Sequence, residues 1–228
     1  IIKMKRTKSY LWAIIGLLTV ALTVTSCMKD EKDDYVYVPL TQAQKTMQIN
    51  AMAGSFEGKM SLFSPNGTRF ERIDSTDIKL TITNDSTLSI TNFPLKLVAR
   101  EVTEKKLKET LDTTVATFTA HISLWKPYKV ERMYKNHSLL YFFGVWPYDT
   151  KPVQKWVAEL PYKYESKPQT LKIEFDGNFA GGLNMGNYNL YNSSNKRLAV
   201  FLVPKEITLG DGKTMRATGL LVVSAGQK

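Results

Sequence analysis

Side chains that could support acid–base, nucleophilic or metal chemistry are few and widely spaced in this sequence of 228 residues. Its two histidines, His121 and His137, are sixteen positions apart, and a zinc site built on them would need carboxylate ligands from elsewhere. His121 alternates with Thr117, Thr119 and Ser123, which is typical of a solvated histidine on the polar face of a strand. We therefore predict neither a metal site nor a cofactor.

Paired carboxylates could hydrolyse glycosidic bonds, but such pairs are recognised by their separation in space and not by sequence spacing. The first candidates are the acids near aromatic residues: Glu131, Asp149, Glu159 and Asp176. The chain has 21 acidic residues, so candidates of this kind arise without any catalytic role. It contains no G-x-S-x-G nucleophile elbow and no phosphate-binding loop. The sequence favours a protein that is not an enzyme, with a glycan-acting hydrolase as the alternative.

The single cysteine, Cys27, follows a basic segment, "MKRTKSY", and the mostly apolar run "LWAIIGLLTVALTV". This is the layout of a secretory signal, and the run is shorter than the about twenty residues of a membrane-spanning helix. The residues "VTS" before the thiol resemble the lipobox of bacterial lipoproteins, where the thiol is alkylated with diacylglycerol and the chain is cut just before the cysteine. The resemblance implies a signal peptide at residues 1–26 and a lipid anchor on Cys27. The folded part then has no thiol.

The residues after Cys27, "MKDEKDD", resemble the surface-export signal of Bacteroidetes lipoproteins, here Lys29, Asp30 and Glu31. We expect residues 27–38 to be a lipidated, acidic and flexible tether. The resemblance implies an outer-membrane lipoprotein at the cell surface, or alternatively on the periplasmic face, which contacts the membrane through its anchor.

Residues 39–228 are expected to form a single β-rich domain, because no repeat or Pro- or Gly-rich linker divides them. The formal net charge is +10, but the basic residues are scattered, which argues against nucleic acid as a partner. Two helices are predicted, one within residues 41–54 and one within residues 93–111, where Pro94 would begin the helix.

Alternating apolar residues predict strands over most of the remaining chain. "SFEGKMSLF" is expected to end at the turn "SPNG", and "DIKLTIT" and "TLSIT" to form a hairpin. In "ATFTAHISLW" the inward positions are predicted to be Ala116, Phe118, Ala120, Ile122 and Leu124. The pattern predicts a mostly β fold, either an antiparallel β-sandwich or a calycin-like barrel with one or two helices, and it leaves these two open.

Eleven of the 25 aromatic residues lie between Trp125 and Tyr164, interleaved with basic residues. We assign four of them to the core: Tyr141, Phe142, Phe143 and Trp156. Four others, at polar positions or strand ends, are expected to be exposed and to form a ligand-binding platform: Trp125, Tyr128, Trp146 and Tyr148. The ligand would be a glycan or a small apolar molecule. The alternative is a structural or assembly role with other envelope proteins as partners.

The whole layout, from the lipobox and acidic tether through "GSFEGKMSLFS" to the ending "TMRATGLLVVSA", resembles the uncharacterised lipoproteins common in gut Bacteroidetes. No reaction is assigned to those families, so the resemblance implies a location and a general architecture only.

Overall fold

A computed structural model of the chain describes residues 38–66, 69–127, 137–147, 156–176 and 189–228. The sites expected at Cys27 and residues 29–31 lie outside these ranges, as do Tyr128, Glu131, Tyr148 and Asp149. Val38–Lys228 make up one compact unit.

The first element is helix α2 (Gln42–Met52), which confirms the helix expected in residues 41–54. Thr41 caps it in a capping box: the Gln44 amide donates to the Thr41 hydroxyl, and the Gln44 side chain accepts from the Thr41 backbone. Ile49 and Met52 are its buried residues.

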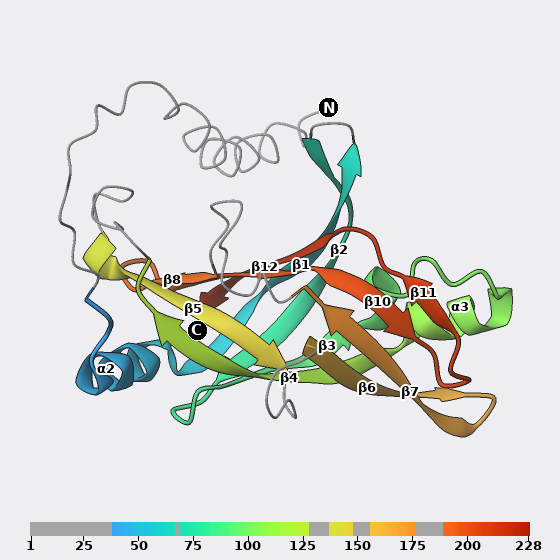
Figure 1. Cartoon of the computed structure of the whole chain (residues 1–228), viewed down its shortest axis with the longest axis horizontal. Coiled ribbons are helices and arrows are strands. Elements are labelled where there is room, and N and C mark those ends of the chain that lie inside the picture. The colour runs from blue at the N-terminus through green and yellow to red at the C-terminus, as the bar shows by residue number, and fades with distance from the viewer. Residues whose placement is uncertain (1–37, 67–68, 128–136, 148–155, 177–188) are drawn as a thin grey trace. The chain divides into compact units, whose positions relative to one another are not determined.

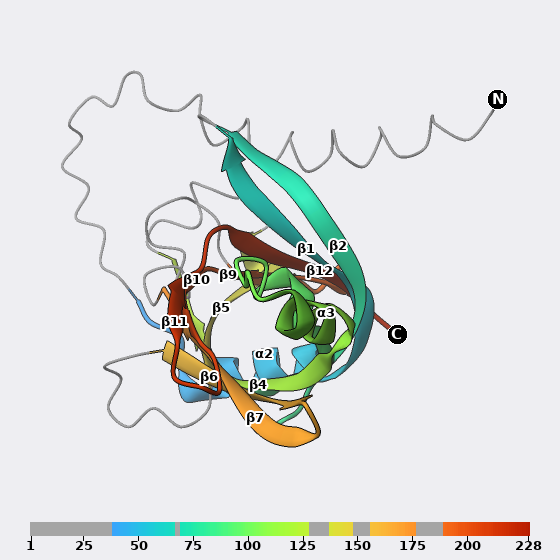
Figure 2. The same cartoon turned by 90° about the vertical axis from the view of Figure 1, so that its right-hand side faces the viewer.

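Within the described residues, eight strands form a closed antiparallel barrel, seen end-on in Figure 2. Each is paired with the next in chain order, and the last returns to the first. They are β1 (Gly54–Asn66), β2 (Arg69–Ile82), β3 (Thr87–Pro94), β4 (Val115–Trp125), β5 (Leu140–Pro147), β8 (Leu190–Asn192), β9 (Arg197–Leu202) and β12 (Leu220–Gln227). This is the topology of up-and-down barrels such as lipocalins. The mostly β prediction is confirmed, and the barrel is the alternative that the structure adopts.

Four further strands form a second antiparallel sheet in the order β11-β10-β7-β6. Two insertions supply it: β6 (Trp156–Tyr164) and β7 (Lys167–Phe175) follow β5, and β10 (Pro204–Thr208) and β11 (Thr214–Arg216) follow β9. The run "TMRATGLLVVSA" therefore forms two strands in two different sheets. Gly219, with a φ of +112°, lies just before the second of them.

The two ends of the barrel are covered by different elements (Figure 1). Helix α2 lies at one end, and helix α3 (Lys105–Thr113) and the 3₁₀ helix η1 (Leu95–Leu97) lie at the other. A second 3₁₀ helix, η2 (His137–Leu139), leads into β5. The helix expected within residues 93–111 forms as α3 and begins only at Lys105. Its predicted start at Pro94 was wrong, because Pro94 ends β3 and the Leu95 amide donates to the carbonyl of Thr114. Residues 95, 97, 98 and 102 are all buried, so this segment packs into the barrel end.

The interior of the barrel is filled by side chains. Every predicted inward residue of β4 is buried, and Phe118 and Phe143 are fully buried. The interior residues form one continuous cluster with those of α2, α3 and the inner face of the second sheet. Phe118, for example, packs edge-on against Phe175 of β7, with ring centroids 5.9 Å apart.

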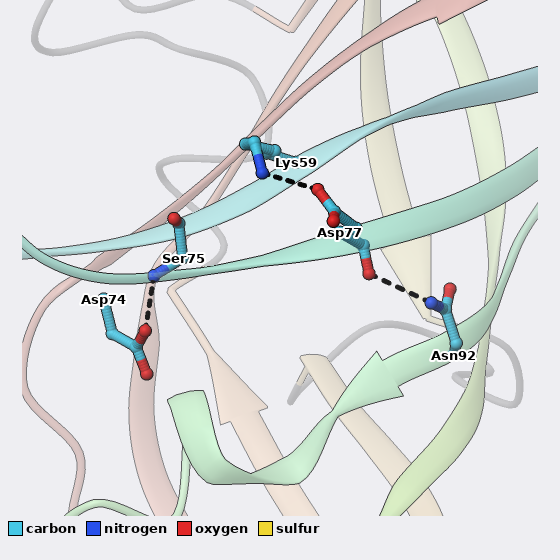
Figure 3. A network of polar contacts seen from close by, with 5 residues as sticks. All are labelled: Lys59, Asp74, Ser75, Asp77 and Asn92. Atoms are coloured by element: carbon cyan, nitrogen blue, oxygen red, sulfur yellow. Dashed lines mark hydrogen bonds and ion pairs between the residues drawn. The ribbon is translucent and has the colours of Figure 1, made fainter. Parts of the chain in front are cut away.

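The side chain of Asn92 extends the hydrogen-bond ladder between β2 and β3 where the pairing of these strands is interrupted. The β2–β3 ladder covers Leu80–Ile82 of β2, and β3 has a register irregularity between Ile90 and Phe93. Beyond it, the Asn92 amide nitrogen donates to the carbonyl of Asp77, 3.0 Å away, and its oxygen accepts from the amide of Lys79 at 2.7 Å. The side chain therefore replaces a peptide group of the missing ladder. Figure 3 shows this site with the neighbouring 2.6 Å ion pair between Lys59 and Asp77, and Asp74 accepting from the backbone of Ser75.

Helix α3 is tied to the β6–β7 turn by polar contacts. Lys106 forms a 2.5 Å ion pair with Glu165, and the Tyr164 hydroxyl donates to Glu104, which raises the pKa of Tyr164 to about 12. The turn residues Glu165 and Ser166 have φ values of +50° and +64°, a backbone region that favours glycine.

Candidate ligand-binding surface

The outer wall of strands β4 and β5 carries two of the four predicted platform residues. Cross-strand partners of an antiparallel sheet lie on the same face, and here His121 is paired with Trp146, and Trp125 with Phe142. The next positions along, where Ile122 is opposite Val145, point into the barrel and are buried. Trp125 and Trp146 are therefore on the outside, as their parity predicts.

Four aromatic side chains gather on this wall, and we call Trp125, Phe142, Trp146 and Trp156 the outer aromatic patch. The rings of Trp125 and Phe142 are 6.3 Å apart between centroids and tilted by 56°. Trp146 and Trp156, at the start of β6, are only 4.3 Å apart and tilted by 55°. The patch thus consists of two aromatic pairs, one from neighbouring barrel strands and one that joins the barrel to the second sheet.

Polar residues lie beside the two pairs, with Ser123 between them and His121 opposite Trp146. Ser123 and His121 are exposed, Gly144 opposite Ser123 is buried, and the three tryptophans are half-buried. Phe142 and Trp146 are four residues apart on one strand, which is about 13 Å. This spacing suits two linked sugar rings, since a pyranose can stack on an indole while a hydroxyl and an imidazole bind its hydroxyl groups.

The indole nitrogen of Trp146 is buried without a hydrogen-bond acceptor in the described structure. A buried donor left unpaired costs about 1–3 kcal/mol, and exceptions of this kind in a native fold call for an explanation. Here the unpaired donor belongs to the ring that is packed most closely in the patch.

The space behind the patch is too small for a ligand. Trp156 borders a hollow of about 10 Å³ that is also lined by Val145, Phe175 and Asp176. That volume holds roughly one water molecule. This hollow cannot take a ligand, so a ligand of this patch would lie on its outer surface.

The acids proposed as hydrolase candidates give no catalytic pair in the described residues. Glu159 accepts from Lys172 in a 2.7 Å ion pair and is exposed. Asp176 borders the small hollow, and its backbone amide donates to the carbonyl of Val203.

The described residues also contain no group of three or more His, Cys, Asp or Glu side chains that could hold a metal ion. In the same part of the chain, no helix is long and apolar enough to cross a membrane.

Phe142 is the member of the patch that the sequence did not reveal. It was assigned to the core with Tyr141 and Phe143, and it is indeed buried, with 3% of its surface exposed. Its register, however, places it on the outer face, and the signal was its shared parity with Trp146. Trp156, also assigned to the core, packs against the core but keeps a partly exposed surface.

The fold and this surface define an up-and-down β-barrel with a filled interior and an aromatic outer wall. The chain belongs to the family of the domain of unknown function DUF4840, whose family model matches residues 51–209. This match includes seven of the eight barrel strands, β1 to β9 without β12, and all four residues of the patch. No curated protein and no solved structure matches the chain.

Proposed function

We propose that the protein is a lipid-anchored cell-envelope protein whose barrel domain binds glycans, without catalysis, on the outer aromatic patch. One observation carries the binding part: half-buried tryptophans lie beside exposed polar residues on a wall whose interior side is filled. Aromatic residues that serve only for packing need no exposed polar residues beside them. A carrier of apolar molecules would need an interior cavity. A glycan needs both a ring surface and hydrogen-bonding groups.

The anchoring part rests on the sequence around Cys27. The thiol follows "VTS" at the end of an apolar run, and the acidic segment after it precedes the first described residue, Val38. Two acyl chains are enough for stable attachment, since each buried CH₂ contributes about 0.8 kcal/mol. Cys27→Ala should abolish incorporation of labelled fatty acid, and a variant that is still labelled would exclude acylation at this position.

The surface location is tested by a second variant. Exchanging Lys29, Asp30 and Glu31 together for Ala should leave the protein lipidated but protect it from protease added to whole cells. Equal digestion of the variant and the parent would remove the export-signal argument.

Glycan binding can be measured by intrinsic fluorescence. Trp12 is in the signal, so the three tryptophans of the mature chain are all members of the patch. A soluble oligosaccharide that binds there should shift the emission of the parent protein. Trp146→Ala should weaken that binding at least tenfold, because stacking on one aromatic ring contributes about 1–3 kcal/mol where it has been measured for nucleobases.

The matched control is Val115→Ala. Val115 is exposed on the outer face of β4, at the opposite end of that strand from Trp125. Binding that is equally strong in Trp146→Ala and Val115→Ala would place the ligand elsewhere. A panel of neutral, acidic and amino-sugar oligosaccharides without any response would contradict the glycan proposal.

A further inference from the structure

The end of the barrel that carries helix α2 is the end at which the chain enters the described domain (Figure 1). Three segments adjoin there, and we call them the α2 end: helix α2 with its cap Ala53, the β8–β9 turn (residues 193–196), and residues 226–228. The side-chain nitrogen of Gln227 donates to the carbonyl of Ala53 at 2.8 Å. The backbone amide of Gln227 donates to the carbonyl of Lys196 at 2.9 Å.

The solvent-facing side of α2 carries no charge. Its exposed residues are Gln42, Ala43, Gln44, Thr46, Met47, Asn50 and Ala51. Lys45, the only charged residue of the helix, is half-buried. In helix α3, by contrast, five of the nine residues are charged and exposed: Lys105, Lys106, Lys108, Glu109 and Asp112. A surface helix normally has charges on its polar face, and an uncharged face leaves water at a much lower cost.

Two large apolar side chains are exposed at this end of the barrel. Met47, on the solvent-facing side of α2, is 57% exposed, and Val38, just before the helix, is 60% exposed. Among the described residues, no other large apolar side chain is more exposed than these two. The uncharged surface of α2 is therefore also the place where the domain presents most apolar surface to solvent.

Basic side chains lie beside this uncharged surface. Lys196 in the β8–β9 turn, Arg197 at the start of β9, and Lys228 are all exposed. The segments of the α2 end contain no acidic residue. The neighbouring Glu57 is paired with Lys228 at 2.6 Å and with Lys79 at 3.7 Å, so its charge is compensated.

Asp85 is a further acid on this side of the barrel. It lies in the β2–β3 turn, and Ile82 just before that turn is opposite Gly54 at the start of β1. Its carboxylate accepts from the hydroxyl of Thr83 and from the amide of Thr87, which hold it within its own turn. This one acid stands against the two exposed basic residues next to the β8–β9 turn, so the charge of this side stays positive.

We propose that the α2 end lies on the lipid surface that holds the anchor, with Val38 and Met47 among the headgroups and the basic residues against lipid phosphates. The inference rests on the proposed acylation of Cys27. Val38 follows Cys27 by eleven residues, a span of at most about 40 Å when fully extended. The α2 end is therefore the first part of the domain that the anchor brings to the membrane. Apolar side chains suit the headgroup boundary, and lysine and arginine are attracted to anionic lipids.

The contact is shallow and depends on the anchor. Two apolar side chains bury little surface, so the α2 end alone binds vesicles weakly. The anchor keeps the domain beside the surface and so raises the effective concentration for this contact. Its consequence is an orientation: with the α2 end on the membrane, the side wall that carries the outer aromatic patch stays open to the surroundings.

An exposed aromatic residue at the other end of β1 provides a control. The β1–β2 hairpin continues past Phe63, where the pairing with β12 ends, as an arm on which Phe70 is 49% exposed (Figure 1). The turn expected at "SPNG" was misplaced, because β1 runs through Pro65 to Asn66, where no partner strand requires a backbone donor from proline. Strand β1 has 13 residues and is about 40 Å long, so Phe70 stays in water when the α2 end lies on the membrane.

A fluorescent label that reports contact with lipid tests the orientation. Full, acylated Met47→Cys and Phe70→Cys chains are labelled with nitrobenzoxadiazole in vesicles of phosphatidylethanolamine and phosphatidylglycerol. Cys27 is the only native cysteine, so an acylated chain has no other thiol to label. A doxyl-labelled phospholipid should quench the label at position 47 several-fold more strongly than the label at position 70. Equal quenching at the two positions would overturn the proposal.

A second form of the chain separates failure of this contact from failure of the anchor. In Cys27→Ala chains, a polyhistidine tag before residue 27 and a nickel-chelating lipid replace the acyl chains. If Cys27 takes up no fatty acid, stronger quenching at position 47 in the tagged form still supports the contact, while the acylation proposal is wrong. Weak quenching at position 47, with an emission shift only when outer-membrane proteins are added, would overturn it and assign this surface to a protein partner.

Charge reversal gives a second readout. Lys196→Glu with Arg197→Glu places two acids beside the uncharged surface and should reduce the quenching of the label at Met47 several-fold. The matched control is Lys205→Glu with Lys213→Glu, which changes the net charge equally at exposed positions of the second sheet and should leave the quenching unchanged. Equal quenching in the two double variants would contradict the recognition of lipid phosphates by the α2 end.

Discussion

The two faces of the β4–β5 wall are both rich in apolar side chains, but they are built differently. Toward the barrel axis, Phe118 and Phe143 are fully buried and join the continuous core. On the outside, Trp125 and Trp146 are half-buried beside the exposed Ser123. The inner face is complete without a ligand, whereas the outer face leaves ring surface and polar groups in solvent. This difference is the reason why we propose a binding site on the outer side of the wall.

The largest effect is expected for truncation on the inner face. Phe143→Ala should lower the free energy of unfolding by about 3–5 kcal/mol, because it removes a fully buried ring and leaves a cavity in a filled interior. Denaturant unfolding measures this loss. Ser123→Ala, on the exposed outer side of the same strand pair, should stay within about 0.5 kcal/mol of the parent. Equal losses in these two variants would contradict the assignment of the faces.

A smaller loss of stability is expected for a buried polar residue just before β8. Asn189 is fully buried, and its side-chain oxygen accepts from the amide of Phe201 at 2.7 Å. Asn189→Ala leaves that amide without this acceptor and should cost about 1–3 kcal/mol. Asn195, which makes a similar contact to Arg197 in an exposed turn, is the control and should cost clearly less when changed to Ala.

The tryptophans of the outer aromatic patch should show intermediate and unequal losses. Trp156 packs against the core as well as against Trp146, so Trp156→Ala should cost about 2–3 kcal/mol. Trp125 contacts Phe142 on the outer face, so Trp125→Ala should cost about 1–2 kcal/mol. Unfolding of both variants in urea gives the order, and a Trp125→Ala loss as large as that of Phe143→Ala would make Trp125 a core residue.

The smallest effect is expected in a turn that belongs to neither face. Ser166→Gly should raise the stability by about 0.5–1 kcal/mol, because glycine adopts a φ of +64° without steric cost. Ser194→Gly provides the comparison, since Ser194 is an exposed turn serine that is not among the positive-φ residues. Destabilisation of Ser166→Gly would show that the turn is held by its side chain and not strained by it.

Alternation along the strands was sufficient to predict much of the barrel wall. The inward set of β4, from Ala116 to Leu124, is buried as its parity requires, and so are Ile78, Leu80 and Leu88 of the predicted hairpin. Such positions depend on local sequence, because one face of each strand meets the core.

Other features depend on contacts between distant segments. Leu95, Val98 and Val102 have helical spacing, yet they are all buried at the barrel end. Residue spacing predicts the face of a helix but not that a segment packs into the end of a barrel. Burial of Phe142 on an outer face, and the closeness of Trp146 to Trp156, likewise require knowing how the second sheet meets the barrel. The alternation along β4 and β5 identified Trp125 and Trp146 as outward-facing, but not the aromatic rings that each of them contacts.

Ligands are proposed to bind on the outer wall and not inside the barrel. Nuclear magnetic resonance can test it with residues 28–228, by titrating soluble oligosaccharides and, separately, palmitate. We expect an oligosaccharide to shift the indole N–H signals of Trp125 and Trp146, while the methyl signals of Ile122, Val145 and Val200 stay unchanged with either probe. Shifts of those interior methyl groups, with unchanged indole signals, would contradict it and show a barrel that opens to take its ligand inside.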